Sequence, residues 1–122
     1  MMYSNGVDHV LVIYEDGHGK CQVRDYLRSQ SKKVRGHAGW LLQALDEHGH
    51  RLDRPTVGHL GNGIYELWII IDRQQHRVLF FFDHEFIVAT NAFFKKSDRV
   101  PDEELTRAKK ARQQWRDQGN RQ

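Results

Sequence analysis

The sequence predicts a small α+β domain. A sheet of four to five strands, antiparallel except at a mixed edge, packs against two N-terminal helices and carries a C-terminal helix. Helical spacing of apolar residues follows one early β-branched run, and three closely spaced apolar runs come later. The breaks between those three runs are too short for a parallel crossover, so the runs must pair as antiparallel hairpins. We expect the helices to cover one face of this sheet and to leave the other face more open.

The first half of the chain contains one strand and two helices. Residues 9–14 are β-branched and apolar, and the turn-forming residues 15–19 end this strand. From Gln22 onward the apolar period becomes helical, and it resumes after Ser31 until Gly49, which suits a helix C-cap. The apolar positions that define the two helical faces are Val23, Tyr26, Leu27, Val34, Ala38, Leu41, Leu42 and Leu45.

The second half contains the main strands and the last helix. The apolar runs are residues 64–71, 77–82 and 86–94, separated by polar turns at 72–75 and 83–85, and residues 56–60 are the candidate for a further short strand. Pro101 followed by three acids predicts a helix start. One stripe along this helix is formed by Leu105, Ala108, Ala111, Arg112 and Trp115.

Composition excludes several classes of protein. The 122 residues fit one domain, 1–122, and 39% hydrophobic with 29% charged residues is typical of a globular chain rather than a disordered one. No apolar run approaches the roughly 20 residues of a membrane span, and no signal peptide is evident. The single cysteine, Cys21, cannot form an internal disulfide, so we expect a reducing, cytoplasmic location.

Positive charge is concentrated at the C-terminal end. Residues 1–94 contain 10 Lys or Arg and 11 Asp or Glu, whereas residues 95–122 contain 9 Lys or Arg and 5 Asp or Glu. A basic end on a near-neutral body indicates an anionic partner, with nucleic acid as the first candidate. The alternative is a basic helix whose charges only keep it solvated.

The alternation of side chains along the predicted strands places a candidate cationic site on the more open face of the sheet. Glu66 and Trp68 fall opposite the uniformly apolar positions of their strand, and Arg77 is the only charge in the next run. Lys95 and Lys96 close the last strand. Arginine and lysine bind phosphate, and a tryptophan on a sheet can stack a base. Arg77 can equally be a solvated strand end, and Trp68 can equally be core.

Other chemistries find little support. The eight histidines include His48, His50 and His59, but their spacing matches no zinc motif. His84 falls in a hairpin turn. No nucleophile elbow or nucleotide-binding loop is present, so we expect no cofactor and no metal.

The order of motifs resembles the RelE/ParE superfamily of bacterial toxins, and most of all its HigB-like, phage-derived branch. The motifs are Leu60–Gly63, Tyr65–Leu67, Arg77-Val78, Phe93–Lys96, a proline with acids, a basic helix, and upstream the segment Val23–Leu27. The resemblance covers nearly the whole chain and implies the RelE-like fold.

The resemblance also implies an activity. Such toxins belong to type II toxin–antitoxin systems and cut mRNA on the ribosome without a metal, using the 2′-hydroxyl of the RNA as nucleophile. Arg77 matches the strand-start arginine that contacts the scissile phosphate, and Lys95 and Lys96 match the basic pair at the end of the final strand. Glu66 matches an acid for which a base role is conceivable. We expect RNA contacts from Trp68, Arg99, Lys109 and Lys110.

Two departures from the family pattern stand beside this match. Trp68 replaces a usual arginine, and Asn91-Ala92 replace a usual histidine-glycine. They keep two alternatives open: a non-catalytic toxin of the same fold that inhibits DNA gyrase, and a decayed toxin that only binds its antitoxin. The expected partners are a helix-turn-helix antitoxin and the ribosome with its mRNA. We expect the protein to form a heterotetramer with the antitoxin and to involve no membrane.

Overall fold

The computed structural model describes residues 9–49 and 56–119 and confirms the predicted α+β fold class. Strands and helices follow in the predicted order, with boundaries within a few residues of those expected. The elements are β1 (Val10–Ile13), α1 (Gln22–Arg28), α2 (Lys32–His48), β2 (Val57–Gly61), β3 (Ile64–Ile71), β4 (Gln74–Asp83), β5 (Phe86–Phe94) and α3 (Asp102–Asp117).

The strands form one mixed sheet in the order β1-β5-β4-β3-β2. The strands β2 to β5 pair antiparallel, whereas β1 pairs parallel with β5, with Val10 opposite Phe86. This arrangement gives the sheet the mixed edge that the sequence predicted. A bulge interrupts β5 at Thr90, between the pairs Phe80–Ala89 and Leu79–Asn91.

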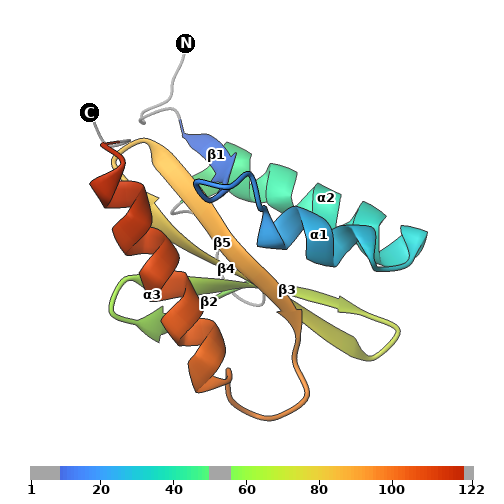
Figure 1. The fold of residues 1–122 in the computed structure, drawn as a ribbon. Helices are drawn as coiled ribbons and strands as arrows, with labels where there is room; N and C mark the ends of the chain where they lie inside the picture. Colours follow the sequence, from blue (N-terminus) through green and yellow to red (C-terminus); the bar gives the residue numbers. More distant parts are fainter. Residues whose placement is uncertain (1–8, 50–55, 120–122) are drawn as a thin grey trace.

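Helices lie on both faces of the sheet (Figure 1). Leu41 and Leu45 of α2 pack with Leu67 and Phe80 on one face. Ala108 and Trp115 of α3 belong to a second core, with Leu79 and Phe81 on the opposite face. The expectation that the helices cover only one face is therefore wrong. The strands are apolar on both sides, so both sides need cover.

Local sequence sets one helix cap and one turn, and the turn determines where the site residues lie. Ser31 caps α2 by accepting a hydrogen bond from the Val34 N–H at 3.2 Å. The β3–β4 turn is only two residues long, because Asp72 and Arg73 adopt φ values of 50° and 67°. As a result β4 begins at Gln74, three residues before the predicted start, and Trp68 lies directly opposite Arg77.

Among the described residues, no helix is both long and apolar enough to cross a membrane.

Candidate functional site

Arg77 and Glu66 form a buried ion pair. The Arg77 Nε donates to Glu66 Oε1 at 3.0 Å, and the two side chains are only 4% and 9% exposed. The remaining guanidinium nitrogens donate to the backbone oxygen of His76 at 3.1 Å and to Gln75 Oε1 at 2.8 Å. Burial lowers the pKa of Arg77, and the charge of Glu66 opposes that shift. The guanidinium is thus enclosed by partners within the protein.

The edge strand β2 packs closely against this pair. The Arg77 Cζ lies 5.4 Å from the centre of the Trp68 ring. A Cβ atom on Gly58 of β2 would stand 3.0 Å from Glu66 Oε2 and 3.0 Å from Trp68 Cζ2, so only glycine fits there without a shift. The expectation that Glu66 lies on an open face is therefore wrong. Trp68 is half-buried.

Lys95 and Lys96 line an open cavity of about 350 Å³ at the end of β5. Gln75, Ser97 and Asp98 complete its lining. The Lys95 N–H donates to the Gln75 backbone oxygen at 2.7 Å, and the Gln75 side chain accepts from Arg77. The fold thus brings Arg77, Lys95 and Lys96 to the same end of the sheet, with Gln75 between the arginine and the cavity.

Two residues of this cavity were missed from the sequence. Gln75 was assigned to a turn, although the two-residue turn places it in β4 beside Lys95. Asp98 is the one acidic residue, of those that the structure describes, in the lining of a cavity that Lys95 and Lys96 also line. A lysine pair followed two residues later by an acid was the signal for Asp98, and the hairpin length was the signal for Gln75.

The other predicted RNA-binding residues are dispersed. Arg99 is exposed and its Nη2 donates to Asp102 Oδ1 at 2.6 Å, which partly neutralises its charge. Lys109 and Lys110 are exposed on α3. Lys110 lines a second cavity between α3 and the β1–α1 loop, whereas Lys109 lines none of the described cavities.

The Asn91-Ala92 departure serves packing. Asn91 is fully buried, and its Nδ2 donates to Glu104 Oε1 at 2.9 Å and to the Glu104 backbone oxygen at 3.2 Å, which ties β5 to α3. The backbone of Ala92 exchanges two hydrogen bonds, at 2.6 and 2.8 Å, with the side chain of Gln22 at the start of α1. These two positions join the sheet to helices on both of its faces.

A buried polar pair lies behind the ion pair, on the α1 side of the sheet. His76 is 1% exposed, its Nδ1 lies 2.6 Å from the Tyr26 hydroxyl, and its Nε2 has no hydrogen-bond partner among the described residues. Burial, with help from Arg77, lowers the pKa of His76, and burial raises the pKa of Tyr26 to about 12. Both side chains are therefore neutral near pH 7.

The described histidines form no metal centre. Within residues 9–49 and 56–119, no group of three His, Cys, Asp or Glu side chains could hold a metal ion. His84 is exposed in the β4–β5 turn, and His50 lies outside the described residues.

Comparison with known proteins places the chain in a family. The family model described as "Phage derived protein Gp49-like (DUF891)" matches residues 25–113, well over half of the chain. No curated protein matches the chain significantly. The matched segment runs from α1 into α3 and includes the ion pair and the Lys95–Lys96 cavity. The chain therefore belongs to the Gp49-like family of phage-derived proteins, and through it to the RelE/ParE-like superfamily of toxins.

Proposed function

We propose that this protein is the toxin of a type II toxin–antitoxin system, of the HigB-like kind, and that it cleaves mRNA on the ribosome. The proposal is carried by one observation: in a chain of a toxin family, Lys95 and Lys96 line an open cavity whose wall residue Gln75 is held by the buried Arg77. Two ammonium groups suit a phosphodiester and its extra negative charge during cleavage.

The cavity offers the groups that 2′-hydroxyl attack requires. The Asp98 carboxylate accepts the proton of the 2′-hydroxyl, whose oxygen then attacks the adjacent phosphorus. Lys95 and Lys96 stabilise the phosphorane, and one of them donates a proton to the departing 5′-oxygen. The products are a 2′,3′-cyclic phosphate and a 5′-hydroxyl, so atoms and protons balance. Asp98 replaces Glu66 as the proton acceptor, because Glu66 is bonded to Arg77 and buried.

Arg77 is a positioning residue in this mechanism. Its guanidinium fixes the Gln75 side chain, and Glu66 fixes the guanidinium. Removing Arg77 alone would leave a buried unpaired carboxylate, which costs about 3–5 kcal/mol of stability. Loss of toxicity in such a variant would not separate a catalytic defect from a folding defect.

The test compares two variants of equal charge in growing bacteria. Lys95→Ala/Lys96→Ala should abolish growth arrest and reduce new mRNA 5′ ends, mapped by primer extension, by about 100-fold or more, as loss of a positioned acid and phosphate ligands predicts. Lys33→Ala/Arg116→Ala removes two exposed cations elsewhere and should arrest growth as the unchanged protein does. Undiminished cleavage by the Lys95/Lys96 variant would contradict the proposal.

Asp98 has its own test. Asp98→Asn keeps the size of the side chain and removes its basicity, so cleavage should fall while RNA binding is kept. Cleavage by Asp98→Asn at the rate of the unchanged protein would contradict this role of Asp98.

The partners follow from this proposal. We expect an antitoxin with a helix-turn-helix domain, a heterotetramer of the two proteins, and binding to the ribosome with its mRNA. A neighbouring gene for such a DNA-binding protein and neutralisation on co-expression would support these assignments.

One observation favours a second candidate function, an interaction module without catalysis. Arg77 and Glu66, which match the arginine and the acid of the family pattern, form a buried ion pair with each other and are not exposed to RNA. Such a protein would bind the antitoxin with full affinity, yet it would neither arrest growth nor produce new mRNA ends.

A further inference from the structure

A second cavity, of about 440 Å³, lies between the β1–α1 loop and α3 and shares no lining residue with the Lys95–Lys96 cavity. Two sections of chain that are far apart in sequence supply its positive charge: Lys20 comes from the loop, and Arg107 and Lys110 come from α3. A volume of this size accommodates a small ligand or one unit of a polymer.

The one acid in the lining, Asp16, holds the loop together. Its Oδ1 accepts hydrogen bonds from the N–H groups of His18 at 2.8 Å and Lys20 at 2.9 Å, and these bonds lower its pKa. The Asp16 N–H in turn donates to the Lys20 backbone oxygen at 2.9 Å. The loop therefore holds the backbone of Lys20 in place at the edge of the cavity.

The cations of the cavity differ in how they are paired. Arg107 Nη1 donates to Glu104 Oε1 at 3.0 Å, so its charge is shared. Lys20 and Lys110 are exposed, and in the part of the chain that the structure describes no carboxylate forms an ion pair with either of them. These two ammonium groups are the ones available to an anion.

Polar groups line the buried side of the cavity. Thr90 lies there because the β5 bulge leaves it unpaired in the ladder, and bulges are common beside functional sites. Its hydroxyl donates to Asn91 Oδ1 at 2.6 Å, so Thr90 shapes the cavity and is not one of its donors. The Tyr14 hydroxyl donates to Gln114 Oε1 at 2.8 Å, which leaves the Gln114 amide nitrogen as a donor at the cavity. Donors and cations together suit phosphate oxygens.

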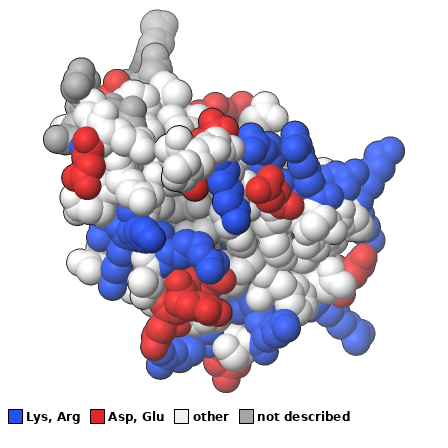
Figure 2. All heavy atoms as spheres, viewed as in Figure 1, with Lys and Arg blue, Asp and Glu red and all other residues white. Residues whose placement is uncertain are grey.

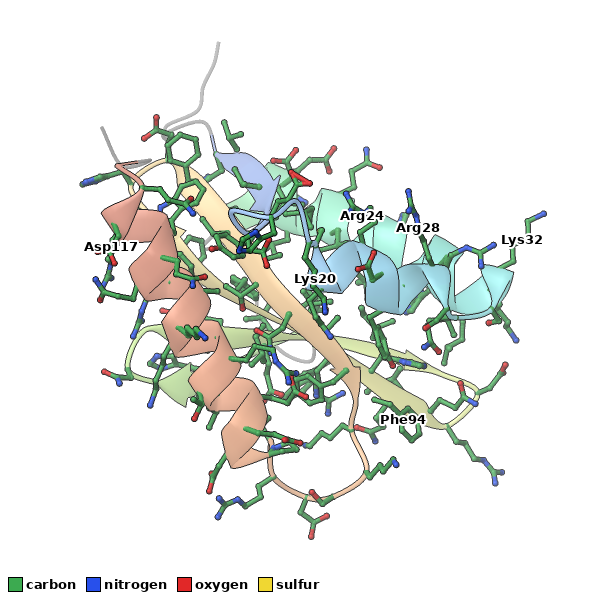
Figure 3. The ribbon with its side chains drawn as sticks, in the orientation of Figure 1. Lys20, Arg24, Arg28, Lys32, Phe94 and Asp117 are labelled. Carbon is green, nitrogen blue, oxygen red and sulfur yellow. The ribbon has the colours of Figure 1, made fainter. Side chains whose placement is uncertain are left out.

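A row of cations continues from the cavity. Lys20, Arg24, Arg28 and Lys32 follow at intervals of four residues, and all four are exposed. Arg24 shares its charge with Glu15 at 3.6 Å and with Asp25 at 3.7 Å. Figure 3 shows them one after another from the loop along α1 to the start of α2, and Figure 2 shows Lys and Arg gathered on this part of the face. Such a row suits an extended polyanion better than a single small ligand.

We propose that this cavity binds a phosphate group of an RNA strand, held by Lys20 and Lys110, and that Arg24, Arg28 and Lys32 contact the backbone that continues from it. The inference rests on the proposed function, since it takes RNA as the ligand, and it adds a binding site outside the Lys95–Lys96 cavity. An acidic peptide is the weaker candidate, because such segments also bury apolar side chains. None of the large exposed apolar residues that the structure describes lines this cavity, namely Val10, Trp40, Ile70 and Phe94.

The binding experiment uses the full chain and a fluorescent oligonucleotide with 2′-O-methyl groups, which cannot be cleaved by 2′-hydroxyl attack. Lys20→Ala/Lys110→Ala should weaken binding about 10-fold and reduce the salt dependence of log Kd by about 0.7 for each phosphate that the variant no longer binds. Lys33→Ala/Arg116→Ala, which removes the same amount of charge, should bind nearly as the unchanged protein does. Equal binding by the two variants would overturn the proposal.

Competing probes identify the source of the phosphate. Inorganic phosphate, a nucleoside monophosphate and an oligonucleotide without terminal phosphates are added in turn. Displacement by the last probe alone supports an internal phosphate, and displacement by the monophosphate as well supports a strand end. Displacement by polyglutamate at the same charge concentration and with the same strength would overturn the proposal in favour of an acidic peptide.

The two proposals fail separately. If Lys95→Ala/Lys96→Ala cleaves mRNA as well as the unchanged protein, the nuclease site is wrong, although weakened binding by Lys20→Ala/Lys110→Ala would still support this cavity. If the first variant is inactive while the second binds as its control does, the nuclease proposal stands and the second binding site is wrong.

Discussion

At the scale of single residues, the buried Arg77–Glu66 pair makes stability depend on both partners being present. Two opposite charges that are 4% and 9% exposed lose most of their hydration, and their attraction compensates only while both are present. Gln75 and the backbone of His76 each accept one hydrogen bond from the two remaining guanidinium nitrogens, so the arginine belongs to a buried polar cluster.

This cluster predicts opposite results for one substitution and for two. Arg77→Ala should lower the free energy of unfolding by about 3–5 kcal/mol, because Glu66 is left buried without a partner. Arg77→Met with Glu66→Leu removes both charges and should restore most of that loss. Urea denaturation of the two variants checks this expectation, and equal destabilisation of the two would contradict it.

His76 predicts a dependence of stability on pH. Its folded-state pKa is lowered by burial and then by Arg77, whereas in the unfolded chain it titrates near 6.5. As the pH falls below about 6.5, His76 becomes protonated in the unfolded chain but stays neutral in the folded protein. The free energy of unfolding therefore declines with falling pH until the lowered pKa of the folded state is reached.

Denaturation at pH 7.5 and at pH 5 measures this effect. The unchanged protein should lose more stability between these two values than His76→Gln, which has no imidazole to protonate at this position. An equal loss in the two proteins would assign the pH dependence to other groups.

At the scale of elements, the β3–β4 hairpin determines which residues meet. The sequence indicated both strands, but it placed the turn at residues 72–75, because four polar residues in succession suggest a long loop. The Asp72–Arg73 turn is shorter, and the strands therefore extend toward it. Pairing register depends on that turn length, so the Arg77–Trp68 contact could not be derived from the apolar pattern alone.

This turn carries a prediction of its own. Arg73 has a φ of 67°, a conformation that costs a non-glycine residue about 1 kcal/mol or more. Arg73→Gly should therefore raise the free energy of unfolding by roughly 0.5–1 kcal/mol, after the greater flexibility of glycine in the unfolded chain is deducted. Thermal or urea denaturation would show the increase, whereas a decrease would mean that the arginine side chain makes a stabilising contact.

At the scale of the whole molecule, the sheet lies between α1 and α2 on one face and α3 on the other. The sequence contained the signal for this arrangement. Val78, Phe80 and Phe82 face one core, while Leu79 and Phe81 face the other, and a strand that is apolar on both sides is typical of a sheet covered on both sides. The apolar stripe of α3 was evident in the sequence, but the face of the sheet that it covers was not predicted.

The candidate site was predictable only in part, for a similar reason. Lys95 and Lys96 could be placed from sequence, because charges that end an apolar strand lie at its exposed end. The second cavity could not be predicted, since it depends on where α3 crosses the sheet and on a bulge at Thr90 that no local sequence pattern indicates. Lys20 and Lys110 are 90 positions apart in the chain and meet only through that crossing.

The place of β5 also affects when the sheet can form. It is the last strand to leave the ribosome, yet it lies inside the sheet, with the first strand on one side and β4 on the other. The nascent chain therefore exposes β1 without its pairing partner until nearly all of the sheet has been made, and contacts of such long sequence separation form slowly. The sheet therefore reaches its final arrangement only after β5 has been synthesised, and a nascent chain without β5 also lacks the strand that leads into Lys95 and Lys96.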